Sequence, residues 1–320
     1  MTVLYDDVLS SAKSRALFPS SQITLTDDNL LSYLEAIVRL ELTSLIDEVN
    51  QEFFVRDTVV PLVASTSEYR IPYRALGRTL REIKFYDSSA NRYQDMAMIK
   101  LEDAYGNITN GGNFGSQFAS FFLKGDKIVL VPDVPASVPS GYSLKLWYKL
   151  IPSYPCTFNN AMQVASVSSP NVVVNQIPTN ISIGTQVDFI EGQAGCELYS
   201  FDKTITNING TTLTFLAADI PTDLQAGDYI SLRQTSPVVN MIPDEAQGYL
   251  ANKLAMLILY SVGDEVGANA IKADVTLQEK QLLKIIAPRV DGKPQIIISR
   301  HNLTRGGRNW QNWYYGTVGG

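Results

Sequence analysis

Histidine and cysteine, which often form metal sites and nucleophilic sites, are scarce in this sequence and poorly spaced for that chemistry. His301 is the single histidine in 320 residues, so there is no histidine cluster for zinc and no evident Ser–His–Asp set. The glycine-rich stretch 106–115 lacks the Lys-Ser/Thr pair of a phosphate-binding loop, and we interpret it as turns. Cys156 and Cys196 have neither metal-binding nor redox spacing. These observations predict no catalytic residue, no cofactor and no metal.

Carboxylates are abundant, and a pair of them could hydrolyse a glycosidic bond. The sequence places no two of them at one cleft. The adjacent pair Asp27 and Asp28 is better explained as the start of a helix, where acidic side chains favour the positive end of the dipole. We therefore predict that the protein is not an enzyme.

The C-terminal stretch 290–320 combines arginines with large aromatic side chains. From Gly292 onward it has four basic residues and no acidic one. Large apolar groups left in water usually mark a contact surface, and Trp, Tyr and Arg dominate protein interfaces. We predict an extended arm that binds a partner protein through Arg300, Arg305, Arg308, Trp310, Trp313, Tyr314 and Tyr315. The alternatives are an arm that folds back on its own domain and one that stacks on single-stranded nucleic acid.

Composition fits an ordinary globular protein of one large or two modest domains. Apolar residues make up 45% and charged residues 18% of the chain, which argues against wholesale disorder, and the net charge of −6 argues against a protein coated in nucleic acid. The longest apolar run, Leu254 to Tyr260, is too short to cross a bilayer. Asp6 and Asp7 fall where the apolar run of a signal peptide would begin. We therefore expect a soluble protein made in the cytoplasm.

Two helical segments far apart in the chain are predicted to share one core. The first runs from Asp27 to Phe54, with Thr26 as a suitable N-cap and apolar residues at helical spacing. The second is a helical hairpin from Pro243 to Ala287, whose Gly263 and Gly267 bracket the turn. Pro243 suits the first position of its first helix. An apolar stripe on each segment would bury the other.

Between these helices the hydrophobic period changes to two, which indicates strands. Lys124-Gly125-Asp126 and Asn209-Gly210 are strong hairpin turns. From 157 to 237 the chain is rich in Val, Thr, Asn and Gly and predicts short strands at 162–168, 171–175, 186–190, 205–208, 211–216 and 228–233.

Together these signals predict an α+β fold. It comprises a helical bundle of the N-terminal long helix and the C-terminal hairpin with a β-sheet region, an inserted all-β barrel or sandwich, and the extended arm. The predicted core spans 1–155 and 238–289, the insertion 156–237, and the arm 290–320.

Three short motifs carry a resemblance to a known family. They are a Tyr-x-Ile-Pro step from Tyr69 to Pro72, an Ile-x-Leu-x-Pro step from Ile128 to Pro132, and an Ile-Pro-acidic start from Ile242 to Glu245. In this order and spacing, across 26–155 and 238–289, the chain resembles the head-to-tail adaptors (connectors) of tailed bacteriophages. It is most similar to tail tubular protein A of short-tailed phages.

The resemblance implies a structural virion protein of the phage neck, assembled in the host cytoplasm. Such adaptors form a ring, usually a dodecamer, beneath the portal protein, and genomic DNA passes non-specifically down its centre without involving a membrane. The arm would then bind the portal, and the tail tube or nozzle would follow below. The insertion is larger than a simple adaptor needs, and it would either hold tail fibres or meet the next tail component. The rival functions are a tail-fibre or baseplate module and a virion-associated cell-wall hydrolase.

Overall fold

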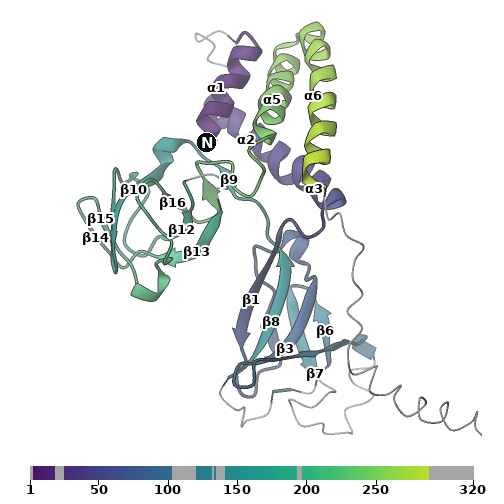
Figure 1. The fold of residues 1–320 in the computed structure, drawn as a ribbon, viewed down its shortest axis with the longest axis vertical. Helices are drawn as coiled ribbons and strands as arrows, with labels where there is room; N and C mark the ends of the chain where they lie inside the picture. Colours follow the sequence, from purple (N-terminus) through teal and green to yellow (C-terminus); the bar gives the residue numbers. More distant parts are fainter. Residues whose placement is uncertain are drawn as a thin grey trace, which may run out of the picture. The chain divides into compact units, whose positions relative to one another are not determined.

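The computed structural model describes residues 3–18, 25–102, 120–131, 133–134, 141–192 and 197–287. Its helices come from the two ends of this part of the chain, and its strands lie between them (Figure 1). The helices are α1 (Tyr5–Arg15), α2 (Asp27–Ala36), the π-helical η1 (Ile37–Leu42), α3 (Thr43–Val49), α5 (Ala246–Val262) and α6 (Glu265–Ile286). Short 3-10 turns occur at η2 (Leu76–Arg78), η3 (Phe158–Asn160) and η4 (Ala217–Asp219).

The first long helix begins as predicted but changes its winding midway. The Thr26 hydroxyl accepts a hydrogen bond from the Asn29 backbone N–H at 3.4 Å, which confirms the N-cap. Within η1 the turns widen, and the Thr43 hydroxyl donates to the Val38 carbonyl at 2.7 Å. The helix then ends at Val49, because Asn50 leaves the helical region with φ −137° and ψ 90°. The predicted extension to Phe54 is therefore wrong.

The helical hairpin near the end of the described chain forms with shifted boundaries. Gly263 closes α5 in the left-handed conformation, at φ 82°, which glycine adopts readily. Gly267 lies inside α6 instead of in the turn. Pro243 precedes α5, whose N-cap is Glu245, so its predicted place as first helical residue is also wrong.

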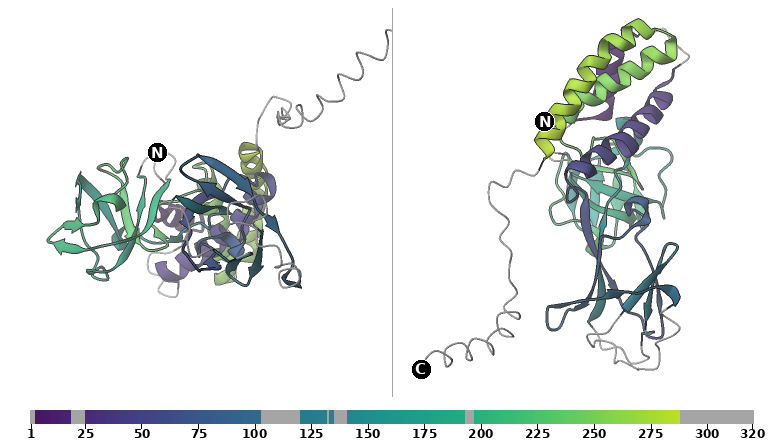
Figure 2. Two further views of the ribbon diagram at one scale, coloured as in Figure 1. Left: turned by 90° about the horizontal axis from the view of Figure 1, so that it is seen from below. Right: turned by 90° about the vertical axis from the view of Figure 1, so that its right-hand side faces the viewer.

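Helices from both ends of the chain share one hydrophobic core. α5 lies in the middle of this group, in contact with α1, α2, η1 and α6. Figure 2 shows the hairpin of α5 and α6 lying along the helix formed by α2, η1 and α3. The most completely buried side chains of this core include Leu30, Leu34, Val38, Leu42, Ile46, Tyr249, Leu250, Leu254 and Ile258.

Two four-stranded sheets follow the first helix. One has the order β1 (Val55–Pro61), β8 (Tyr142–Lys149), β3 (Glu82–Asp87) and β4 (Arg92–Asp95), and the other has β2 (Glu68–Arg70), β7 (Lys127–Val131), β6 (Ser120–Lys124) and β5 (Ala97–Met98). Residues such as Leu144 and Leu146 of the first sheet share a core with Ile128 and Leu130 of the second. Gly125, at φ 62°, forms the predicted turn between β6 and β7.

The longest sheet has seven strands and lies within the predicted insertion. Its order is β13 (Leu198–Thr204), β12 (Gln186–Ile190), β16 (Tyr229–Leu232), β10 (Ala161–Ser168), β11 (Asn171–Val174), β15 (Thr212–Thr214) and β14 (Asn207–Asn209), with every pair antiparallel. A register shift between Val164 and Ser166 bends β10. Val172 and Val187, on strands three places apart, share one core, so the sheet curls over itself. The limits of the insertion stay a prediction.

A two-stranded parallel ladder ties the ends of this region together. β9 (Tyr154–Pro155) pairs with β17 (Thr235–Ser236). The Tyr154 N–H donates to the Gln234 carbonyl at 2.7 Å, and the Cys156 N–H donates to the Ser236 carbonyl at 2.9 Å. The chain therefore enters and leaves the seven-stranded sheet at neighbouring points.

The predicted fold class is wrong. Four sheets account for most elements of the described chain, so it is mostly β and not a helical bundle with an attached β region. The error has a physical cause. Long helices leave strong periodic signals over many residues, whereas strands of two to eight residues leave weak ones that are easily undercounted.

Candidate partner-binding surfaces

The residues predicted to bind a partner through the C-terminal arm all lie outside the described part of the chain. They are Arg300, Arg305, Arg308, Trp310, Trp313, Tyr314 and Tyr315. His301, Cys196 and the glycine-rich stretch 106–115 lie outside it as well. The arm therefore stays a prediction, and the surfaces considered next belong to the helices and sheets.

The outward face of α6 carries apolar side chains that the chain leaves in water. Val266 is 83% exposed and Leu277 is 56% exposed. Together with the exposed Ala270 and Ala273 they follow spacings of four, three and four residues, which place them on one side of a helix. We call these four residues, with the exposed Lys280 and Lys284 that continue the stripe, the α6 face.

A second exposed stripe runs along the helix formed by α2, η1 and α3. Leu40, in the π-helical segment, is 71% exposed. Small exposed side chains flank it, and acidic ones lie at the ends. We call this stripe the α2–α3 face, and its exposed residues are Asp28, Ser32, Ala36, Leu40, Glu41, Ser44 and Glu48. Glu41 also pairs with Lys253 of its own chain at 2.9 Å.

A hollow of about 460 Å³ opens beside the α2–α3 face. Ser32, Ala36 and Leu40 line it from the helix, and Leu76, Gly77 and Ile151 line it from the adjoining loops. Glu35 and Arg39 also border it and pair with each other at 3.1 Å. The hollow therefore has an apolar lining and an ion pair at its edge, which suits an aliphatic side chain better than a charged one.

Sequence reasoning missed both faces. The apolar stripe expected to bury the hairpin is the core side of α6, with Ile271, Val275, Leu282 and Ile286. The same stretch of sequence holds a second apolar stripe, on the opposite side of α6, at positions 266, 270, 273 and 277. No sequence signal marks η1, because a π-helical turn depends on how the neighbouring helices pack.

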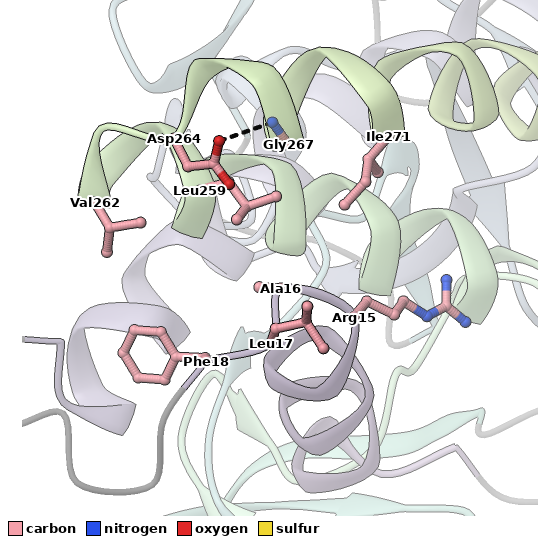
Figure 3. A pocket seen from close by; sticks show the side chains of 9 residues that line it. All are labelled: Arg15, Ala16, Leu17, Phe18, Leu259, Val262, Asp264, Gly267 and Ile271. Atoms are coloured by element: carbon pink, nitrogen blue, oxygen red, sulfur yellow. Dashed lines mark hydrogen bonds between the residues drawn. The ribbon is translucent and has the colours of Figure 1, made fainter.

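Another hollow lies at the turn between α5 and α6, and Figure 3 shows the side chains around it. It measures about 530 Å³. Its two charged residues are already engaged: Asp264 accepts a hydrogen bond from the Gly267 N–H at 2.9 Å, and Arg15 donates to the Gly248 carbonyl at 3.2 Å. The remaining lining is apolar, with Leu17, Phe18, Leu259, Val262 and Ile271. The lining is therefore largely apolar, and its two charged side chains are held by contacts within the chain.

The most deeply buried charges form an ion pair between the loop after β2 and the seven-stranded sheet. Arg74 is 1% exposed and pairs with Asp188, which is fully buried. The Asp188 carboxylate also accepts from the backbone N–H groups of Asp202, at 3.0 Å, and Gln234, at 2.8 Å. Burial raises the pKa of Asp188, and the Arg74 guanidinium opposes this rise.

Two further side chains extend this ion pair toward the surface. The Tyr73 hydroxyl contacts Asp202, and Arg233 Nε lies 3.1 Å from that hydroxyl and 3.0 Å from the Asp202 carboxylate. The Arg233 guanidinium also stacks over the Tyr73 ring at 4.2 Å. Each charge is matched by another in the cluster, which is typical of a structural ion-pair network, and the network joins the loop after β2 to the seven-stranded sheet.

Clustered metal ligands and membrane-spanning helices are both absent from the ranges that the structure describes. Within those ranges, no three His, Cys, Asp or Glu side chains come together as metal ligands. No helix of that same part is both long and apolar enough to span a membrane. No protein-family model matches the sequence, and no curated protein matches it.

Proposed function

We propose that this protein is a structural component that assembles with copies of itself, as the head-to-tail adaptor ring of a tailed bacteriophage. The observation that carries the proposal is the exposure of Leu40, Val266 and Leu277 on two separate helix faces. An apolar stripe that continues along a helix face, as at 266, 270, 273 and 277, marks a contact surface, whereas a single exposed apolar residue does not. Two different faces on one chain are what a ring requires, because head-to-tail contacts that close by rotation use two surfaces of each copy.

The remaining parts of the proposal come from the family resemblance. The ring, a dodecamer by analogy, would lie in the neck between portal and tail. The arm from residue 290 would bind the portal protein, led by Arg300, Arg305, Arg308, Trp310, Trp313, Tyr314 and Tyr315. The acidic balance of the chain would let genomic DNA slide through, since few phosphates would be neutralised. The seven-stranded sheet would contact tail fibres or the next tail ring.

The proposal is tested by measuring mass. Multi-angle light scattering of the purified chain, alone and with purified portal protein, should show a ring-sized assembly in at least one of these samples. A chain that stays monomeric in both, at concentrations well above those in an infected cell, refutes the adaptor role. Turnover of purified peptidoglycan by the chain would favour the rival hydrolase.

Deleting residues 300–320 tests the arm separately. The truncated chain should keep its far-UV circular dichroism spectrum and lose its binding to portal-containing particles. If it docks with unchanged affinity, the assignment of the seven arm residues to portal binding is wrong, whatever the fate of the ring.

A further inference from the structure

We propose that copies of this chain meet head to tail, with the α6 face of one copy seated on the α2–α3 face of a second copy. This inference rests on the proposed function, since it names the two surfaces through which the proposed ring closes. Four observations lead to it: the shapes of the faces, their charges, their heights in the fold, and their positions on different sides of α5.

The two faces are complementary in shape. Leu277 and Val266 project from α6, and Ala270 and Ala273 between them present almost no side chain. The α2–α3 face offers the reverse, a hollow of about 460 Å³ beside Ala36. Small residues on both helices allow the backbones to approach closely, and Leu277 would enter the hollow next to Leu40.

The charges at one end of the two faces are opposite. Lys280 and Lys284 follow Leu277 on α6, whereas Glu41 and Glu48 follow Leu40 on the other face. A parallel contact between two α6 faces would bring four lysines together, and a parallel contact between two α2–α3 faces would gather glutamates. Like charges placed opposite each other are unfavourable, so the mixed contact is preferred over either symmetric one.

The complementary groups also lie at matching heights. The Asn50 side chain donates to the Ile286 carbonyl at 3.4 Å, so α3 and α6 end beside each other. At about 1.5 Å per residue, Leu277 lies about 14 Å along its helix from that point and Leu40 about 15 Å along its own. At the same rise per residue, Lys284 and Glu48 each lie about 3 Å along their helices from the contact between Asn50 and Ile286. A rotation about an axis roughly along these helices keeps heights unchanged, so Leu277 would meet Leu40 and Lys284 would meet Glu48.

Finally, the faces point away from different sides of the central helix. On α5, Asn252 bonds to Gln278 of α6 at 2.9 Å, whereas the next residue, Lys253, pairs with Glu41 of η1 at 2.9 Å, so α6 and η1 lie on different sides of α5. One copy can therefore use both faces at the same time, which a ring needs.

Charge exchange tests the inference in full-length protein. The variant Lys284→Glu and the variant Glu48→Lys should each weaken self-association about three-fold or more in sedimentation velocity, because an attractive pair becomes repulsive. Mixed in equal amounts, they should recover assembly, since every contact in an alternating ring is then matched. Lys272→Glu, an exposed change on the same helix outside the α6 face, should have no effect.

A second readout does not depend on any substitution. Equal amounts of ¹⁴N- and ¹⁵N-labelled wild-type chain are joined by a zero-length carbodiimide cross-linker. Mixed-label peptides should link Lys280 or Lys284 to Glu41 or Glu48. The inference is overturned by mixed-label links that map elsewhere, by charge variants that assemble normally, by a mixture that fails to recover, or by a chain that stays monomeric at millimolar concentration both alone and with portal protein. The first three results leave the adaptor role standing, and the portal assay decides that role separately.

Discussion

Replacing Arg74 by methionine should lower the free energy of unfolding by about 3–4 kcal/mol at pH 7. The change removes the guanidinium from a carboxylate that is fully buried and leaves Asp188 with two backbone N–H donors. The free-energy cost of protonating the Asp188 carboxyl group sets the upper limit on the stability that is lost. Its usual pKa is near 3.9 and each pKa unit corresponds to about 1.36 kcal/mol, so a neutral Asp188 at pH 7 costs about 4 kcal/mol.

The destabilisation caused by Arg74→Met should depend on pH. In the variant the pKa of the folded-state Asp188 rises further above its unfolded value, so the folded state binds the proton more tightly. The stability of the variant is therefore greatest below pH 4 and is lost as the pH rises toward the folded-state pKa. The deficit relative to wild type should shrink to about 1 kcal/mol at pH 4.

Urea unfolding followed by circular dichroism between pH 4 and pH 7.5 measures both effects. The double variant Arg74→Met/Asp188→Asn is the matched control. It removes both charges while an amide oxygen still accepts from the Gln234 N–H, so it should lose less stability than Arg74→Met at pH 7. A deficit below about 1 kcal/mol at pH 7, or one that does not shrink in acid, would show that the buried pair does not hold the loop to the sheet as described.

Three further outcomes are expected. Leu254 lies in the fully buried centre of α5, so Leu254→Ala should lower the free energy of unfolding by about 2–5 kcal/mol. Leu254→Met keeps most of the side-chain volume and should cost less than about 1.5 kcal/mol, a difference that thermal melts can measure. Gly192→Ala should destabilise the fold by about 1–3 kcal/mol, because the added Cβ would lie 2.1 Å from the Gly227 carbonyl oxygen; a wild-type melting temperature would contradict this. Burial raises the pKa of Cys156 to about 12, so its peptide should take up maleimide at pH 8 only after unfolding, as mass spectrometry can show.

The local backbone conformation was predictable from the sequence wherever a few adjacent residues determine it. Thr26 caps its helix, and Gly125 and Gly210 turn their hairpins at φ 62° and φ 57°. The strand over 186–190 was predicted to the residue. In each case the signal lies in the side chain at that position and in its immediate neighbours.

Features that depend on distant contacts were not predictable. β13 occupies 198–204, a stretch without clean alternation, because it pairs with β12 and has two register shifts. Arg74 sits in a loop sequence that reads as an ordinary turn, and its partner Asp188 is 114 positions away. The predicted proportions of helix and sheet were wrong for the same reason, because the local sequence of a short strand does not identify the strand with which it pairs.

The parallel ladder of β9 and β17 bears on how this chain can change over evolutionary time. An inserted segment whose two ends lie next to each other can be replaced by another segment without displacing the helices on either side. A graft at this site would need a new counter-charge for Arg74 and a substitute for the apolar side chains of Ile190, Leu198 and Tyr229. Relatives with the same helices and a different inserted sheet are therefore accessible through a single recombination event.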